Sequence, residues 1–106
     1  VMLLLSAQSQ AKLSVFLTGN SLLQKCESDS NAEFFECGGY IEGIVDFQEA
    51  LVGWSILDEP YFCVQSAPMS QLVKVVTKFL NENPESLHTD AASMASVGLQ
   101  KAFPCN

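Results

Sequence analysis

The sequence contains no arginine and a single histidine, His88. Five lysines stand against twelve acidic residues, which gives a formal net charge of −7. A nucleic-acid-binding surface needs a basic face that displaces counterions from phosphates, and an anionic membrane surface attracts basic segments for the same reason. The composition therefore argues against nucleic acid and against membrane surfaces as partners. A cationic protein is the partner that this charge favours.

Residues for catalysis or metal binding are also scarce. The four cysteines show neither a CxxC motif nor metal-ligand spacing, and one imidazole adds little to them. Nucleophilic catalysis needs a base beside the nucleophile, and Ser86 and Thr89 flank His88 too locally to form a triad. Paired carboxylates such as Asp58 and Glu59 lack the cleft that a glycosidase would provide. We therefore predict no catalytic residue, metal site or cofactor, interpret His88 as a turn residue, and regard the protein as a binder rather than an enzyme.

No alternating apolar and polar run is long enough for a strand, and helical periodicity dominates instead. The expected helices are a short one ending near Cys26, a long one over 33–54, one from about Pro68 to Asn81 and one ending near Phe103. The expected N-caps are Thr18, Asn20 or Ser21 for the first helix, Asn31 for the second and Ser86 or Thr89 for the last, while Pro68 suits the first helical position of the third. Short connections favour antiparallel neighbours. The predicted fold is all-α, a compact four-helix domain.

The long helix over 33–54 has an apolar face about twice as wide as the stripe of an ordinary surface helix. It should therefore pack on two sides, as a central helix or a subunit interface. Tyr40, Phe47 and Trp54 recur every seven residues, with the small Gly43 between them. This pattern is typical of an ordinary core, and the alternative is a homodimer seam with these four residues as its face. The outward-facing residues of this helix are Glu42, Asp46 and Glu49.

Residues 1–11 form a short apolar run followed by small residues, with Ser9 and Ala11 at the −3 and −1 positions of a signal-peptidase site. We interpret this segment as the remainder of a secretory signal peptide whose basic start is missing, and residues 12–106 as a single domain. The alternative is that Met2 to Leu5 begin a buried helix. No stretch approaches the roughly 20 apolar residues of a transmembrane helix, so we expect no membrane insertion.

Four cysteines in a small exported chain imply two intrachain disulfides. In an antiparallel helix pair the end of the first helix lies beside the start of the second, which brings Cys26 near Cys37. The start of the third helix likewise lies beside the end of the fourth, which brings Cys63 near Cys105. Of the three possible connectivities we predict this one. The two bonds would contribute about 3 and 4 kcal/mol by closing loops of the unfolded chain.

A set of short motifs follows in order along nearly the whole mature chain. These are Phe16 to Asn20, Leu22-Leu23, Cys26, Cys37, Gly39 to Gly43, Asp46, Cys63, Gln71 to Val73, Phe79-Leu80, Asn83 to Glu85, His88, Ala91-Ala92 and Ala102 to Cys105. Together they resemble the Rap/Tai immunity proteins, small exported helical proteins of Gram-negative bacteria that neutralise type VI secreted peptidoglycan amidases. The resemblance implies a periplasmic, disulfide-bonded and often dimeric domain that binds a Cys/His amidase and blocks its substrate groove. The family often has a proline soon after the third cysteine, where this chain has Val64 and Gln65, so the cognate toxin stays open.

An inhibitor that occludes a groove needs a protruding loop on a rigid scaffold. Two segments of the chain are candidates, the loop over 58–65 and the turn over 81–88, and the alternative for each is an ordinary solvated loop. The candidate contact residues are Asp58, Glu59, Tyr61, Glu82, Glu85 and His88. In the loop we expect Tyr61 and Phe62 to tuck under the chain while the two carboxylates stay in water.

A different class of function also fits the sequence. A small periplasmic carrier or stress chaperone would use the aromatic residues of the long helix to hold an apolar ligand or an unfolding client. Binding of a fluorescent apolar dye by the native protein distinguishes this alternative from a closed bundle.

Overall fold

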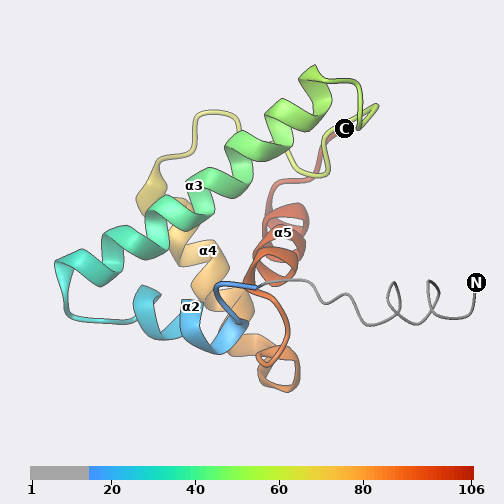
Figure 1. Ribbon diagram of the computed structural model, residues 1–106. Coiled ribbons are helices and arrows are strands. Elements are labelled where there is room, and N and C mark those ends of the chain that lie inside the picture. The colour runs from blue at the N-terminus through green and yellow to red at the C-terminus, as the bar shows by residue number, and fades with distance from the viewer. Residues whose placement is uncertain (1–14) are drawn as a thin grey trace, which may run out of the picture.

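The computed structural model describes residues 15–106, and helices make up its regular structure (Figure 1). The elements are α2 (Gly19–Cys26), α3 (Asn31–Gly53), α4 (Met69–Glu82), the 3-10 turn η1 (Pro84–Ser86) and α5 (Ala91–Ala102). The described residues form no strand, and their only β contact is an isolated bridge between Thr18 and Asp90. The predicted all-α fold of four helices is confirmed. The predicted signal-peptide remnant over 1–11 lies outside the described residues.

Each of the first two helices begins after an N-cap residue. The side chain of that residue accepts a hydrogen bond from a backbone N–H in the first turn, which has no partner within the helix. The Thr18 hydroxyl accepts from the Ser21 N–H, which confirms one of the three caps predicted for α2. The cap predicted for α3, Asn31, is wrong because Asn31 is already the first helical residue. Ser30 caps α3 instead, since its Oγ lies 3.3 Å from the Glu33 nitrogen, three residues further on.

The last two helices begin one residue away from the predicted positions. Asp90, rather than Ser86 or Thr89, caps α5 by accepting from the Ser93 N–H at 2.9 Å. Hydrogen bonds from Ser93 also hold the pKa of the Asp90 carboxyl below its ordinary value. Thr89 is unsuited to capping because its hydroxyl donates to the Ser86 carbonyl at 2.7 Å, within the preceding turn. Pro68 is the cap of α4 and not its first residue, since its ψ of 157° is extended.

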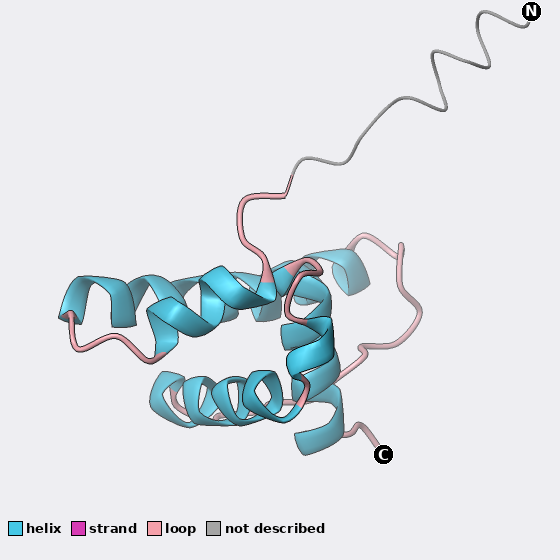
Figure 2. Cartoon of the chain, turned by 90° about the horizontal axis from the view of Figure 1, so that it is seen from below, coloured by secondary structure: helices cyan, strands magenta, loops and turns pink. Residues whose placement is uncertain are grey.

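The core lies between the helices, and each helix contributes at least one side chain with no exposed surface. These side chains are Leu22 from α2, Ile41 from α3, Leu80 from α4 and Leu99 from α5. Every helix contacts the three others, so the apolar stripes meet in one core. Figure 2 shows this packing from below, with loops at the helix ends. No helix within residues 15–106 has the length and apolar character needed to cross a membrane.

The long helix α3 is covered on one side only. Cys37, Ile41 and Gln48 are buried, whereas Phe47 and Trp54 are 57% and 63% exposed. The prediction that α3 packs on two sides is therefore wrong within a single chain. Periodicity identified the apolar flank correctly, but the described part of the chain has no further helix to cover it.

Both predicted disulfides are present. Cys26–Cys37 joins the end of α2 to the first turns of α3, with a Cα–Cα distance of 5.1 Å. Cys63–Cys105 joins the loop before α4 to the segment after α5, with a Cα–Cα distance of 5.2 Å. The first bond is buried in the core, whereas Cys105 is exposed. The first bond therefore fastens the α2–α3 hairpin inside the core, and the second fastens the α3–α4 loop to the C-terminal segment near solvent.

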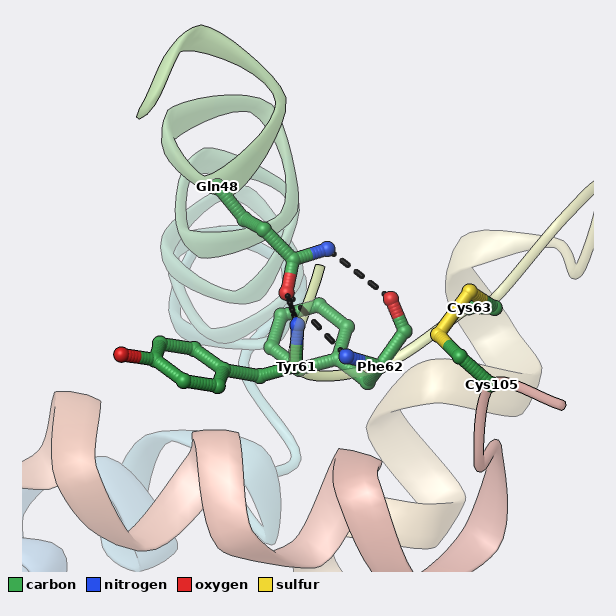
Figure 3. The surroundings of a disulfide bond; sticks show 5 residues. All are labelled: Gln48, Tyr61, Phe62, Cys63 and Cys105. Atoms are coloured by element: carbon green, nitrogen blue, oxygen red, sulfur yellow. Dashed lines mark hydrogen bonds between the residues drawn. A yellow bond between two sulfur atoms is a disulfide. The ribbon is translucent and has the colours of Figure 1, made fainter. Parts of the chain in front are cut away.

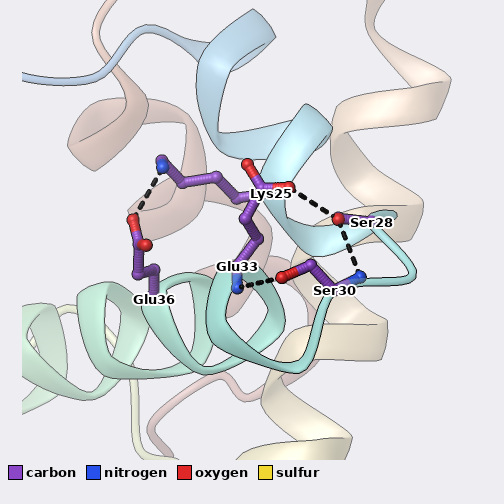
Figure 4. Close-up of polar contacts among 5 residues, drawn as sticks. All are labelled: Lys25, Ser28, Ser30, Glu33 and Glu36. Atoms are coloured by element: carbon purple, nitrogen blue, oxygen red, sulfur yellow. Dashed lines mark hydrogen bonds and ion pairs between the residues drawn. The ribbon is translucent and has the colours of Figure 1, made fainter.

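Polar contacts fasten the turn between α2 and α3 on its outer side (Figure 4). Lys25 Nζ donates to Glu36 at 2.6 Å, and the hydrogen bond to Glu36 raises the pKa of Lys25. Ser28 Oγ donates to Glu33 at 2.7 Å and accepts from the Ser30 N–H at 3.0 Å. Such exposed contacts contribute little to stability, but they fix the register of the α2–α3 hairpin beside its disulfide.

Candidate functional site

A groove opens between α3, the α3–α4 loop (residues 54–68) and α5. Its volume is about 460 Å³, and no charged side chain lines it. The lining residues are Gly39, Tyr40, Gly43, Ile44, Phe47, Gln48 and Leu51 from α3, Leu57, Tyr61 and Phe62 from the loop, and Ala92 and Ser96 from α5. A concave apolar surface with few polar groups is suited to binding.

Gln48 fixes the position of the loop beside this groove (Figure 3). Its side chain is 4% exposed and extends from α3 to the loop backbone. Its Oε1 accepts from the N–H groups of Tyr61 at 2.7 Å and Phe62 at 3.1 Å, and its Nε2 donates to the Phe62 carbonyl at 2.9 Å. The amide therefore satisfies three backbone groups that would otherwise be left without partners at a largely buried site. The sequence analysis did not identify Gln48 as a functional residue.

The same loop is attached at both of its ends. Near its start, the Ile56 N–H donates to the Leu51 carbonyl of α3 at 2.9 Å. Further along, the Cys63 N–H donates to the Phe103 carbonyl at 2.8 Å, and the disulfide joins Cys63 to Cys105. The segment between these anchors is therefore held against the bundle instead of extending freely from it.

Large apolar side chains remain exposed along this edge of the molecule. We call Phe47, Trp54, Ile56 and Tyr61 the apolar rim; their exposed fractions are 57%, 63%, 66% and 56%. The rings of Phe47 and Trp54 meet edge to face, with centroids 6.3 Å apart. Exposed apolar groups gathered at a groove are typical of an interaction surface.

The expectation that Tyr61 tucks under the loop is wrong, whereas the expectation for its neighbour Phe62 is confirmed. Phe62 is 2% exposed and packs into the core beneath the loop, whereas Tyr61 is 56% exposed. The Tyr61 side chain extends instead along α5, where it lines both the groove and an adjoining hollow with Ser93 and Val97 (Figure 3). Asp58 and Glu59 are exposed, as expected.

The four residues predicted as a possible dimer face lie along one flank of α3. Gly43, Phe47 and Trp54 are exposed, and Tyr40 is partly buried beside the groove. Burial raises the pKa of the Tyr40 phenol, and the negative charge of Asp90 raises it further. The flank is therefore available for contact with another chain.

The second group of predicted contact residues lies elsewhere. Glu82 ends α4, Glu85 lies in η1 and His88 lies in the turn before α5, and all three are exposed. Figure 1 shows this orange segment at the opposite end of the molecule from the yellow-green start of the α3–α4 loop. Tyr61 thus lines the groove, and Asp58 and Glu59 lie on the loop that borders it, whereas the other three residues lie apart from it. The described residues contain no group of three potential metal ligands.

Charge is distributed unevenly along the chain. Residues 26–73 include nine of the twelve acidic residues and no lysine. The acidic residues of this segment are Glu27, Asp29, Glu33, Glu36, Glu42, Asp46, Glu49, Asp58 and Glu59. Lys74, Lys78 and Lys101 lie on α4 and α5, where Lys101 stacks over the Phe79 ring with its Nζ 5.3 Å from the centroid. The groove and its rim therefore lie in the acidic part of the molecule.

Comparison with known proteins identifies the family. The family model described as Rap1a immunity proteins matches residues 18–105, a range that includes the four helices of the described residues, both disulfides and the groove. A search of curated proteins found no match. The family description implies a protein that acts against a secreted toxin by binding it, which agrees with an exposed apolar groove suited to binding. The chain therefore belongs to the family of Rap1a immunity proteins.

Proposed function

We propose that this protein is a periplasmic immunity protein that binds a type VI secreted peptidoglycan amidase and occludes its active-site groove. Family membership supports the toxin-binding role, and two disulfides support export to an oxidising compartment. In this proposal residues 1–11 are the remainder of the signal peptide that directs export. The mechanism is steric, because the inhibitor needs only to occupy the space that the peptidoglycan stem peptide would take.

The observation that supports occlusion most directly is the anchored α3–α4 loop. Gln48 and the Cys63–Cys105 disulfide hold it before any partner arrives, so little conformational entropy is lost on binding. Ordering a free side chain at an interface costs about 0.5–1.5 kcal/mol, and a pre-ordered loop avoids much of that cost. Tyr61 and Ile56 then provide exposed apolar anchors, the type of residue on which interface affinity often depends.

The carboxylates of the loop have a separate role in this proposal. Asp58 and Glu59 are exposed next to the anchors and belong to the lysine-free segment over 26–73. Charges at the rim of an interface mainly accelerate association with a partner of opposite charge. We therefore expect cationic groups around the substrate groove of the amidase.

The experiment that tests the proposal is cleavage of purified peptidoglycan by the amidase encoded nearest to this gene. The reaction is run with and without the oxidised protein at equal molar amounts. Stoichiometric loss of cleavage, together with a complex in size-exclusion chromatography, is the expected result. Full cleavage and no complex would contradict the proposal.

A second candidate function is a carrier or chaperone for an apolar ligand or client. The observation that favours it is the open apolar groove of about 460 Å³ with the exposed apolar rim beside it. A native protein that binds a fluorescent apolar dye strongly, and does not bind the amidase, would support this function instead.

A further inference from the structure

The two disulfides have different relations to the core. Cys26 and Cys37 belong to the cluster of buried apolar residues, whereas neither Cys63 nor Cys105 does. Cys63 is half-buried and Cys105 is exposed. Opening the first bond therefore disturbs the packing between α2 and α3, whereas opening the second leaves the packing of the helices in place.

The second bond completes the attachment of the α3–α4 loop. Gln48 holds the loop at Tyr61 and Phe62. Beside the disulfide, the Cys63 N–H donates to the Phe103 carbonyl at 2.8 Å. A single backbone hydrogen bond near solvent is readily exchanged for bonds to water. The covalent bond is therefore what keeps this end of the loop in position.

A hollow at the surface gives access to the same bond. Its volume is about 500 Å³, and its lining includes Cys63, Gln65 and the two neighbours of Cys105, Pro104 and Asn106. No charged side chain lines it. Thiol–disulfide exchange requires that a thiolate reach a sulfur. The Cys63–Cys105 bond can therefore form or open while the helices remain packed.

We infer that the Cys63–Cys105 bond is a redox switch that gives the protein its high affinity for the toxin only after export. This inference rests on the proposed function, in which the α3–α4 loop occludes the amidase. In the thiol form the loop is released beyond Phe62, so binding has to order it at a cost in conformational entropy. In the disulfide form the loop is ordered before the toxin arrives.

The compartments on the two sides of export determine the state of the bond. Cytosolic thiols are kept reduced, whereas an oxidising compartment converts them to disulfides. A cell that makes the toxin and its inhibitor in one cytosol has to secrete the toxin free of the inhibitor. An inhibitor with a released loop leaves the toxin uncomplexed in the cytosol and gains affinity where protection is needed.

Closure of the bond is an exchange with a protein or small-molecule disulfide donor. The exposed Cys105, as its thiolate, attacks one sulfur of the donor, which forms a mixed disulfide and releases the other donor sulfur as a thiolate. The Cys63 thiolate then attacks the Cys105 sulfur, which forms the Cys63–Cys105 bond and releases the donor as a dithiol. Two electrons pass from the cysteines to the donor, and the two thiol protons are taken up by the donor thiolates.

The first test removes each bond in turn. Cys63→Ala with Cys105→Ala should keep the helical circular-dichroism signal but bind the amidase encoded nearest to the gene, with its catalytic cysteine replaced, at least tenfold more weakly in calorimetry. Cys26→Ala with Cys37→Ala is the matched control, which should lower the melting temperature and keep wild-type affinity while folded. Wild-type affinity in the first variant, or an equal loss in both, would overturn the inference.

The second test follows the loop without the toxin. Hydrogen exchange is measured on the oxidised protein and on protein in which alkylation shows that Cys63 and Cys105 alone are reduced. Amides of residues 61–67 should exchange at least tenfold faster in the reduced form, while those of α2 and α3 stay protected. Oxidised glutathione should restore both the protection and the affinity. Unchanged exchange of the loop, or affinity that does not return with the bond, would overturn the inference. An oxidised protein that neither binds nor inhibits the amidase would instead contradict the proposed function itself.

Discussion

Gln48 makes three hydrogen bonds to the backbone of Tyr61 and Phe62, and each one holds the loop against α3. Gln48→Ala leaves those backbone groups without partners at a largely buried site, where each unsatisfied group costs about 1–3 kcal/mol. We expect the free energy of unfolding to fall by about 3 kcal/mol in urea denaturation. Gln71→Ala, at an exposed position of α4, is the control and should change it by less than about 0.5 kcal/mol. Equal effects of the two substitutions would show that Gln48 does not hold the loop.

In the proposed function, Asp58 and Glu59 contribute to toxin binding through their negative charge. Asp58→Lys combined with Glu59→Lys should slow association with the amidase, because a rim charge of the wrong sign repels a cationic partner. Surface plasmon resonance should show the association rate falling about tenfold or more at low salt, with less effect at high salt. The control is Glu82→Lys with Glu85→Lys, which makes the same change of charge at the other end of the molecule. If the control variant slows association and the loop variant does not, the contact lies at the 81–88 turn.

At the scale of single elements, Gly39 and Gly43 lower the helix stability of α3 along its exposed flank. Gly39→Ala and Gly43→Ala should each raise the free energy of unfolding by about 1 kcal/mol, since both positions have room for a methyl group. Gly98→Ala in α5 should lower it, because the new Cβ would lie 2.9 Å from Cβ of Phe79. Chemical denaturation of the three variants measures these changes. A loss of stability at Gly39 or Gly43 would mean that the flank is occupied in the free protein.

The two disulfides join elements in different surroundings, so they should differ in their response to a reductant. Cys105 is exposed, whereas Cys26 and Cys37 are 7% and 0% exposed. Thiol attack requires access to a sulfur, so mild reduction should open Cys63–Cys105 first. Alkylation followed by mass spectrometry identifies the first bond to open. The protein should then lose affinity for the toxin while retaining its helical circular-dichroism signal, and initial opening of Cys26–Cys37 would contradict this account.

The helices and disulfides could be predicted from the sequence because both depend on local pattern. The spacing of apolar residues predicts the positions of α3 and α5 in the sequence. Antiparallel packing of neighbouring helices then brings the cysteines of each disulfide together. Helix starts were less certain, since neighbouring polar residues such as Ser30 and Asn31 compete to cap, and only backbone geometry decides between them.

The groove could not be predicted, because it depends on contacts between residues distant in sequence. A polar residue on the apolar side of α3 was the signal for Gln48, but its partners lie about 14 residues away in an irregular loop. The same loop decides that Phe62 is buried and Tyr61 exposed. Periodicity shows that the flank of Phe47 and Trp54 is apolar, and it does not show whether another element covers that flank.

At the scale of the whole molecule, the distribution of charge and the position of the groove coincide. The lysine-free segment over 26–73 includes α3 and the whole α3–α4 loop, which provide ten of the twelve groove-lining residues. The three lysines of α4 and α5 lie outside this segment. An approaching cationic protein is therefore attracted toward the side of the molecule with the exposed apolar rim. In the proposed function, electrostatic attraction brings the partner near, and apolar contact and the anchored loop then hold it.

Occlusion of the amidase active site is tested most directly by the reactivity of the catalytic cysteine in the complex. The amidase is mixed with increasing amounts of this protein, and alkylation of that cysteine by iodoacetamide is followed by mass spectrometry alongside peptidoglycan cleavage. We predict that both alkylation and cleavage fall in proportion to the immunity protein and reach a minimum at equal molar amounts. A stable complex in which the cysteine is alkylated as fast as in the free enzyme would contradict occlusion.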